Sequence, residues 1–555
     1  LPLSHLNSAE HFWPETVFEA LSEVDWNALK ADNTVLGDGQ AECPLILDKG
    51  RVYLYRYWQH ESYVADELKR LSTALPISES LMVQSLHALF PTNLNTTPDW
   101  QKIAAAIAVQ KRFAVISGGP GTGKTTTVIK LLALYIEQCQ AQNKKPIIRL
   151  VAPTGKAAAR LSESISGAKE KINLQQTISD QIPTEASTLH RLLGVIPDSV
   201  SFRHDVHNPL HLDLLIVDEA SMIDLPMMAR LLQALPDNAR VVLLGDRDQL
   251  ASVEAGSVLA DICNWPGELA YTSAQNAMLQ RLCQLETPLC EGHDAEHPFT
   301  DCLALLRKSY RFAVDSGIGH LSRAVNQADE QRIKSLVEGQ SEDLFFCGLD
   351  QQSYRDMLNQ VVDFYGEIVR QAEAGVAPAD LLQHMSQFQL LCALRSGDYG
   401  IEGVNESVRT ALAQRGLIRG EGLWFPGRPV MVIRNDASTG LFNGDIGITL
   451  TDDEGRLKVW FEQNGTIRAF LPSRLPEHES VFAMTVHKSQ GSEFDSVALL
   501  LPPDDHPLLT RELVYTAITR ARRRLYLYCR GELLVTASKR VTERAGGLSL
   551  RLWDK

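Results

Sequence analysis

Short apolar runs alternate with helical stretches along most of the chain beyond residue 98. An Ala-rich helix is expected over Gln101 to Arg112, and the buried strand Phe113 to Ser117 that follows it runs directly into glycines. Further buried strands are expected at 147–152, 212–218, 240–245, 389–395, 496–501 and 524–529. Buried strands separated by helices are typical of parallel sheets that are covered on both faces. The pattern predicts an α/β fold with two such sheets.

Two segments depart from this alternation. The N-terminal part is expected to be a small separate α+β unit, with a hairpin over 44–58, a helix over His60 to Leu71, and a linker over Pro91 to Pro98. Residues 427–472 consist of short β-rich pieces between turn residues, which predicts a small inserted SH3-like β-barrel. The predicted domains are therefore 1–97, 98–304, 305–426 with 473–555, and 427–472.

Composition places the chain among globular proteins. It has 555 residues, a formal net charge of −14 and 44% hydrophobic residues, and this length predicts several domains. No apolar run approaches the ~18 residues of a membrane-spanning helix, and the start lacks the features of a signal peptide. The first residue is Leu1 rather than Met, so we expect a trimmed chain from a cytosolic protein.

The nine cysteines include no CxxC pair, which favours free thiols in a reducing compartment. A polar stretch over 264–304 holds one cluster of possible metal ligands, namely Cys283, Cys290, His293, His297 and Cys302. Because the spacing within this cluster matches no standard zinc site, we favour an ordinary polar insertion over a metal centre.

A glycine-rich loop is the strongest chemical signal. Residues Gly118 to Thr125 match the P-loop pattern, directly after a strand and before a helix expected over Thr126 to Gln138. The glycines let backbone N–H groups surround a phosphate, and the helix directs its positive end at the same anion. Lys124 is expected to reach the β and γ phosphates, and Thr125 to ligate Mg²⁺.

An acidic pair follows a second apolar strand. Asp218 is placed to hold the shell of the Mg²⁺ ion, and Glu219 to polarise the attacking water. The alternative is an acidic helix cap after a strand. Two adjacent carboxylates favour ATP hydrolysis over nucleotide binding alone.

Hydrolysis also needs positive charge at the γ phosphate in the transition state. Arg311 and Arg520, both in the second half of the chain, are candidates. Their residue type alone leaves open the alternative that each arginine forms a surface ion pair.

Taken in order, seven blocks resemble the helicase motifs of superfamily 1B, nearest to the RecD family, the α subunits of bacterial exonuclease V (RecBCD) complexes. These blocks are Gly118 to Thr125, Ala152 to Ala158, Asp218 to Ser221, Gly245 to Leu250, Ser309 to Phe312, Val486 to Phe494 and Tyr515 to Arg522. The resemblance covers nearly the whole chain from Trp100 onward.

The resemblance implies two RecA-like domains that clamp ATP between them. It implies that Gln101 reads adenine, that Gln249 senses the γ phosphate, and that Arg311 and Arg520 are arginine fingers. Tyr310 could stack on adenine or belong to core packing. The nucleotide-binding residues implied in all are Gln101, Gly118, Gly119, Gly121, Thr122, Gly123, Lys124, Thr125, Thr126, Tyr310 and Glu493.

The resemblance also implies a set of DNA contacts without base preference. These residues are Thr154, Lys156, Thr188, His190, Thr485, His487 and Ser489. For His190 the alternative is a helix-start residue bonded to backbone. The segment Val195 to His211 lies where related helicases carry a strand-separating hairpin, although an ordinary surface loop is the plainer interpretation.

The implied activity is that of an ATP-dependent 5′ to 3′ DNA helicase in double-strand break repair and recombination. The implied partners are DNA and RecB-like and RecC-like subunits, with the N-terminal unit docking on the RecC-like one. No nuclease metal cluster is recognisable in the sequence, so the nuclease is expected in another subunit. Competing interpretations are an RNA or 3′ to 5′ helicase, and an ATP-dependent scaffold or switch that does not unwind.

Overall fold

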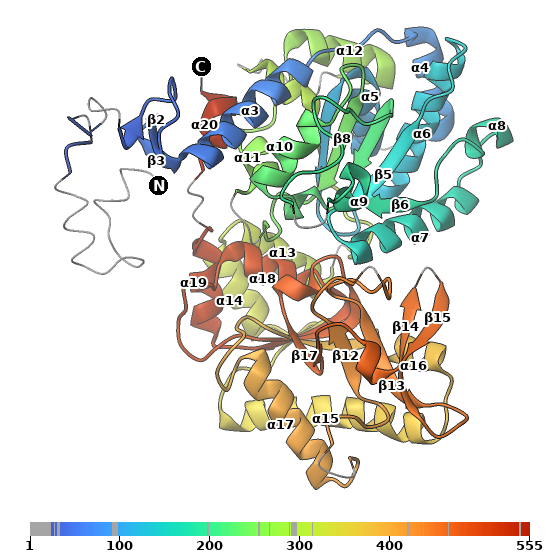
Figure 1. Cartoon of the computed structure of the whole chain (residues 1–555), viewed down its shortest axis with the longest axis vertical. Helices are drawn as coiled ribbons and strands as arrows, with labels where there is room; N and C mark the ends of the chain where they lie inside the picture. Colours follow the sequence, from blue (N-terminus) through green and yellow to red (C-terminus); the bar gives the residue numbers. More distant parts are fainter. Residues whose placement is uncertain are drawn as a thin grey trace.

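The computed structural model arranges the chain around two parallel sheets, one above the other in Figure 1. The upper half holds the P-loop, and the lower half holds the antiparallel insertion. The residues that the structure describes are 24–26, 28–29, 34–91, 98–196, 199–252, 256–265, 267–287, 289, 297–313, 315–418, 422–436, 438–463, 465–542 and 546–554.

The first sheet has six parallel strands in the order β6-β5-β7-β8-β4-β9. The strands are β4 (Phe113–Gly118), β5 (Ile148–Ala152), β6 (Ala186–Thr188), β7 (Leu214–Val217), β8 (Arg240–Gly245) and β9 (Leu303–Leu306). The helices around it include α5 (Trp100–Gln110), α6 (Lys124–Gln140), α7 (Gly155–Lys171), α9 (Leu189–Leu193), α10 (Leu225–Gln233), α11 (Val258–Ile262) and α12 (Ser273–Cys283). The four strands predicted here are confirmed. The domain boundary predicted after residue 304 falls inside β9, which pairs with β4 because its apolar residues continue this sheet.

The second sheet has five strands in the order β10-β19-β18-β11-β17, all of them parallel. The strands are β10 (Leu344–Phe346), β11 (Phe388–Cys392), β17 (Ala483–Thr485), β18 (Phe494–Leu500) and β19 (Ala521–Tyr528). Leu391 and Leu499 pack toward one face with α13 (Gly317–Asn326) and α18 (Arg511–Ile518). Leu390 and Leu500 pack toward the other with α15 (Gln351–Glu373) and α17 (Ile401–Gln414). Because side chains alternate along a strand, a strand covered on both faces is apolar throughout, as the sequence predicted.

The insertion is an antiparallel sheet in the order β15-β14-β13-β12-β16. Its strands are β12 (Pro429–Val432), β13 (Ile446–Thr451), β14 (Leu457–Gln463), β15 (Thr466–Phe470) and β16 (His478–Ser480). Val430, Val459 and Phe461 form its small core. The sheet continues past the predicted end at residue 472, because β16 returns to pair with β12.

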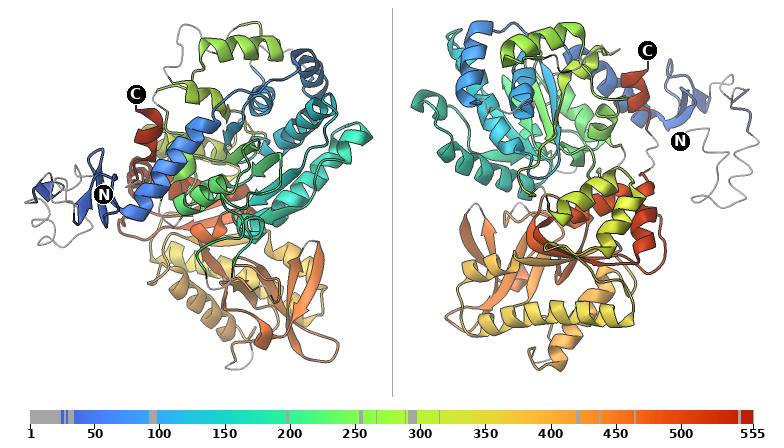
Figure 2. Two further views of the ribbon diagram at one scale, coloured as in Figure 1. Left: turned by 45° about the horizontal axis from the view of Figure 1, so that its top comes forward. Right: turned by 180° about the vertical axis from the view of Figure 1, so that it is seen from behind.

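The N-terminal unit holds the predicted hairpin, β2 (Leu45–Asp48) and β3 (Arg51–Leu54), with β1 (Leu36–Gly37) parallel to β2. The helix expected from His60 begins earlier, as α3 (Tyr55–Leu71), and α4 (Glu79–Leu89) follows it. Residues 92–97 of the predicted linker lie outside the described residues. The small sheet projects to one side in Figure 2, whereas α3 and α4 pack on α10, α12 and α6 and share the hydrophobic core of the first sheet domain. The expectation of a separate N-terminal unit therefore holds only for the small sheet.

The C-terminal helix α20 (Leu548–Trp553) was expected to belong to the second sheet domain. It packs instead on α3 and α11, beside the N-terminal unit in both figures. Trp553 donates to the carbonyl of Asp261 at 3.1 Å. Ion pairs hold α20 in this place. The Arg551 guanidinium pairs with Asp48 and, at 3.0 Å, with the buried Glu61.

Cys283 and Cys302, from the cluster of possible metal ligands, are buried thiols, and burial raises the pKa of each to about 12. Cys290 and His293 lie outside the described residues. Within the described ranges, no group of three or more His, Cys, Asp or Glu side chains could hold a metal ion. In the same ranges, no helix has both the length and the apolar character needed to cross a membrane.

Replacing Arg551 tests how strongly the C-terminal helix holds the N-terminal unit. Arg551→Ala leaves Glu61, which is 2% exposed, with only the Tyr53 hydroxyl and the Gly547 N–H as hydrogen-bond donors. Removing one partner of a buried ion pair costs about 3 to 5 kcal/mol. Urea unfolding should show a loss of this size. Lys49→Ala, which breaks the exposed pair with Asp554, serves as the control and should cost less than about 1 kcal/mol. Equal effects of the two substitutions would contradict this assignment.

Candidate functional site

A cavity of about 480 Å³ lies between the two parallel sheets. The first domain contributes the P-loop, α7 and the loop after β7, and the second contributes the segments at 491–493 and 520–522. The lining residues are Pro120, Gly121, Thr122, Gly123, Lys124, Thr125, Thr126, Ala157, Arg160, Leu161, Ser164, Asp218, Glu219, Gln249, Tyr310, Arg311, Gly491, Glu493, Arg520 and Arg522.

The P-loop joins β4 to α6, which begins at Lys124. Gly121 and Gly123 have φ values of +74° and +80°, which favour glycine. A Cβ on Gly121 would clash with that of Arg311, so this glycine also lets the arginine approach the loop. The Lys124 ammonium donates to the carbonyl of Gly118 at 2.6 Å. It therefore lies inside the loop, where a phosphate would meet it.

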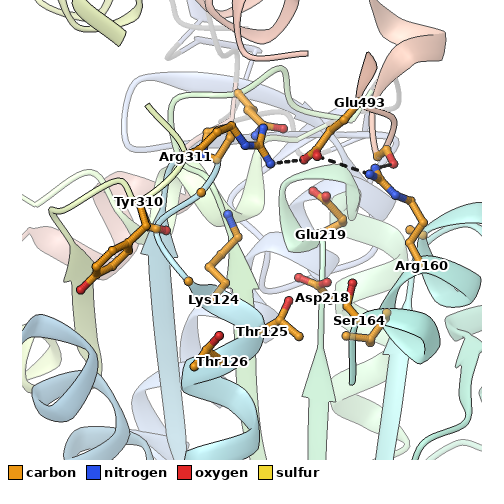
Figure 3. A pocket seen from close by; sticks show the side chains of 18 of the residues that line it. Lys124, Thr125, Thr126, Arg160, Ser164, Asp218, Glu219, Tyr310, Arg311 and Glu493 are labelled. Atoms are coloured by element: carbon orange, nitrogen blue, oxygen red, sulfur yellow. Dashed lines mark hydrogen bonds and ion pairs between the residues drawn. The ribbon is translucent and has the colours of Figure 1, made fainter. Parts of the chain in front are cut away.

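The acidic pair follows β7 at the floor of the cavity (Figure 3). Burial, with the neighbouring Glu219 carboxylate, raises the pKa of Asp218 to about 6, although Lys124 opposes the shift. A buried carboxylate whose charge is disfavoured is a place where a cation would be stabilised. The oxygen atoms of Asp218 and Thr125 are the hard donors that suit Mg²⁺.

Glu493 reaches the cavity from the second domain and is surrounded by guanidinium groups. Its two carboxylate oxygens meet Arg311 at 2.5 Å, Arg522 at 3.2 Å and Arg160 at 3.5 Å. Figure 3 shows Arg311 and Arg160 converging on it from opposite sides. Burial alone would raise the pKa of Glu493, but the arginines, Arg311 first among them, hold it at about 2. The carboxylate is therefore an anion held where several cations meet.

Arg520 also lines this cavity, and only 3% of it is exposed. Its guanidinium donates to the carbonyls of Thr516 and Ser492, both at 3.1 Å. Burial lowers its pKa. Arg311 is paired, but its partner Glu493 lies inside the cavity. The alternative of surface ion pairs therefore does not describe either arginine.

Gln249 lies on the loop after β8 of the first domain, and this loop contacts the second domain. Its amide donates to Asp246 at 3.1 Å, and the Tyr515 hydroxyl donates to the same carboxylate at 3.0 Å. One residue on, the Leu250 N–H donates to the Thr516 hydroxyl at 2.9 Å, and its carbonyl accepts from the Gln490 amide at 2.7 Å. The loop after β8 is thus bonded directly to the second domain.

Gln101 and Tyr310 flank the P-loop. The amide of Gln101 donates to the carbonyl of Thr122 at 3.0 Å, although Gln101 itself is not among the lining residues. Tyr310 lines the cavity, and its N–H donates to the carbonyl of Gly121 at 2.7 Å. Because 61% of Tyr310 is exposed, the alternative that it belongs to core packing is wrong.

None of the seven residues expected to contact DNA lines this cavity. The hydroxyls of Thr154 and Thr188 cap α7 and α9 by accepting N–H groups, both at 3.2 Å. Thr485, at the end of β17, accepts from the Lys488 N–H at 3.3 Å. These threonines have local structural roles in addition to any contact with a ligand.

Lys156 is covered by the loop between β12 and β13. A Cβ on Gly155 would lie 2.5 Å from the Phe442 ring, so the loop packs closely on the start of α7. Burial lowers the pKa of Lys156 to about 8, Arg160 adds to the effect, and Asp445 opposes it. The insertion therefore closes over the first turn of α7.

Of the three remaining candidates, Ser489 is buried, His487 is half-buried and His190 is exposed. Burial lowers the pKa of both His190 and His487. The ring of His190 lies against Phe202, with centroids 5.8 Å apart. Ser489 is fully buried, and its hydroxyl donates to the carbonyl of Val486 at 2.7 Å, so a DNA contact there would require local rearrangement.

The segment Val195 to His211 folds back on itself, with bridges from Val195 to Phe202 and from Asp205 to Asn208. Residues 197 and 198 lie outside the described residues. Val200 and Val206 are 76% and 65% exposed. The segment is thus a bridged hairpin with exposed apolar side chains.

Four residues in or beside the cavity were missed from the sequence, namely Arg160, Ser164, Asp246 and Arg522. Arg160 and Ser164 lie four and eight residues after Lys156 on α7, a helical spacing that could have indicated a shared face. Asp246 and Arg522 fall within recognised blocks, but their roles depend on the approach of the other domain.

Comparisons with known proteins agree with this architecture. Residues 101–255 match a family model described as an AAA domain, and residues 480–528 match one described as a UvrD-like helicase C-terminal domain. Subunit RecD of the RecBCD enzyme of Haemophilus influenzae is 40% identical, over 92% of this chain and 81% of that protein. The Mycobacterium tuberculosis subunit RecD is 37% identical, over 97% and 85%. The ATP-dependent RecD2 DNA helicase of Deinococcus radiodurans is 31% identical, over 75% of this chain and 46% of that one.

Two parallel sheets with a P-loop cleft between them and a UvrD-like C-terminal domain define a helicase-type ATPase of superfamily 1. Sequence identity of 37–40% to two RecD subunits, over more than nine tenths of the chain, then identifies the family within this class. The chain belongs to the RecD family of RecBCD enzyme subunits.

Proposed function

We propose that the chain is an ATP-dependent 5′ to 3′ DNA translocase and helicase. It acts as the motor subunit of a RecBCD-type helicase-nuclease in double-strand break repair and recombination. One observation carries the proposal: the P-loop of the first domain and two arginines of the second meet in a single cavity. A nucleotide bound there touches both domains, as an ATP-driven motor requires.

ATP occupies the cavity with its phosphates in the P-loop. Gly118, Gly119, Gly121, Thr122 and Gly123 offer backbone to the phosphates, Lys124 neutralises them, and Thr126 lies in the first turn of α6 behind them. Gln101 and Tyr310 lie on the adenine side. Thr125 and Asp218 would hold Mg²⁺, which would offset the negative charge of the phosphates.

For hydrolysis, Glu219 orients the attacking water. Gln249, on the loop after β8, senses the γ phosphate, and this loop is bonded to the second domain. Arg311 and Arg520 stabilise charge in the transition state. Glu493, now paired with Arg311, would yield that guanidinium to the γ phosphate and remain near the nucleotide. Closure of the two domains on ATP and their release after hydrolysis would move them relative to each other.

A single DNA strand runs across the candidate residues Thr154, Lys156, Thr188, His190, Thr485, His487 and Ser489. These lie on the first turns of α7 and α9, at the end of β17 and just beyond it, so both domains contact the strand. Polar side chains at these positions suit contacts to phosphate and sugar. The insertion, an SH3-like barrel in this proposal, swings off Lys156 to admit the strand. The hairpin at 195–211 parts the duplex.

The N-terminal unit (1–97) docks on a RecC-like subunit of a cytoplasmic bacterial complex that also contains a RecB-like subunit. The names of the Haemophilus influenzae and Mycobacterium tuberculosis relatives support these partners, since both are called RecBCD enzyme subunits. The first sheet domain is 98–306 with α20, the insertion is 427–480, and the second sheet domain is 307–426 with the chain from 481 to the start of α20.

A 5′-tailed duplex tests activity and direction together. The purified chain, alone and with co-expressed partners, should unwind a duplex with a 5′ overhang and leave a 3′-tailed duplex intact. Lys124→Gln should abolish unwinding, because the ammonium that meets the phosphates is lost. ATP hydrolysis without unwinding of either duplex would contradict the proposal and favour the ATP-dependent scaffold or switch.

The role of Arg520 has a matched control nearby. Arg520→Ala should lower kcat for ATP hydrolysis by about 10³-fold or more, because an arginine finger acts in the transition state. The control is Arg523→Ala, since Arg523 is 78% exposed at its side chain and pairs with Asp495 only at 4.0 Å. It should retain the rate of the unsubstituted chain. Similar rates for the two variants in a steady-state assay would exclude Arg520 as a finger.

A further inference from the structure

Helix α7 reaches from the candidate DNA surface to the ATP cavity. Its cap is Thr154, and Lys156 lies in its first turn. Arg160, four residues later, lines the cavity, and residues four apart share one face of a helix. A single rigid helix thus carries a side chain at each of the two sites.

Arg160 bonds across the domain interface. One guanidinium nitrogen lies 3.5 Å from a carboxylate oxygen of Glu493, and another donates to the carbonyl of Gly491. Gly491 has a φ of +69°, and a Cβ there would lie 3.9 Å from that of Ala157 on α7. The helix therefore packs directly on this turn.

The turn to which Arg160 is hydrogen-bonded follows candidate DNA-contact residues in the chain. Thr485, His487 and Ser489 immediately precede Gly491 in the chain. Arg160 is thus attached to one candidate DNA segment through α7 and to the other through Gly491. The same guanidinium group also faces Glu493.

Glu493 divides its two oxygens between opposing arginines. Oε1 accepts from Arg311, while Oε2 faces Arg160 and Arg522 (Figure 3). A carboxylate pulled toward Arg160 leaves Arg311 less tightly bound. Arg160 belongs to the first domain and Glu493 to the second. Any movement of α7 relative to the second domain therefore changes this balance.

We infer that Arg160 is a positioning residue that couples DNA binding at the start of α7 to ATP hydrolysis, by controlling how firmly Glu493 holds Arg311. The inference rests on the proposed function, since it presupposes DNA at α7 and an arginine finger at Arg311. A DNA strand that shifts α7 strengthens the ion pair between Arg160 and Glu493. Arg311 is then released toward the γ phosphate.

The test compares ATPase rates with and without a single-stranded oligonucleotide, using the full chain. Arg160→Ala should reduce the ratio of the DNA-stimulated to the DNA-free rate by about 10-fold, within the usual range of coupling between sites. The loss should appear in kcat of the stimulated reaction more than in KM for ATP. Arg160→Lys keeps the charge but cannot contact Glu493 and the Gly491 carbonyl through two separate nitrogens. Its ratio should therefore fall between those of the unsubstituted chain and Arg160→Ala.

Lys171→Ala is the matched control, because Lys171 is an exposed basic residue at the C-terminal end of the same helix. Its ratio should equal that of the unsubstituted chain. Thermal unfolding of each variant identifies a folding defect, and if Arg160→Ala does not fold, the ratio for Arg160→Lys decides.

The outcomes separate the inference from the function on which it rests. If DNA does not stimulate the unsubstituted chain, the proposed function fails. If DNA stimulates it but the folded Arg160 variants keep the full ratio, the inference fails. It also fails if both rates fall equally, since Arg160 would then serve the ATP site alone.

Discussion

The meeting of arginines from both domains at one carboxylate is the interaction on which the cleft depends. Two like charges 4 Å apart repel by about 4 kcal/mol at an effective dielectric constant of 20. Arg160, Arg311 and Arg522 all lie within 4 Å of Glu493, and Arg520 is buried nearby. An anion between these arginines offsets their mutual repulsion and so favours the close approach of the two domains. The phosphates of ATP can meet the same requirement, which is why nucleotide and domain closure belong together.

The DNA side follows from the same arrangement. The candidate contacts Thr154 and Lys156 lie at the start of α7, which lines the cavity, and those at 485–489 lie just before the lining residue Gly491, so movement at one site is expected to reach the other. Phe442 packs on Gly155, next to Lys156, and Ser489 is buried, so this conformation does not present the whole candidate surface to a strand. Binding of DNA would have to move the insertion and the turn before Gly491, and that turn is held by Arg160.

Much of the fold was predictable because its central strands are buried on both faces and therefore read as continuous apolar runs. The P-loop and the acidic pair were predictable because each is a local pattern after such a strand. Short strands such as β6 and β17 were missed, since three residues make no recognisable run. The return of α20 to the N-terminal unit was also missed, because it depends on Glu61 and Arg551, which are far apart in sequence. Arg160 was missed because its partners Gly491 and Glu493 are far away in sequence, although its helical spacing from Lys156 was a usable signal.

The most direct test of the account is the affinity of the full chain for a fluorescent single-stranded oligonucleotide, without nucleotide and with a saturating non-hydrolysable ATP analogue. Two sites that share one interface must influence each other, and couplings between sites are typically about 5- to 150-fold in affinity. The account predicts a change of at least about 5-fold, with the oligonucleotide altering the affinity for the analogue by the same factor. Equal affinities under the two conditions would show that the cleft and the DNA surface are independent, which would contradict the account.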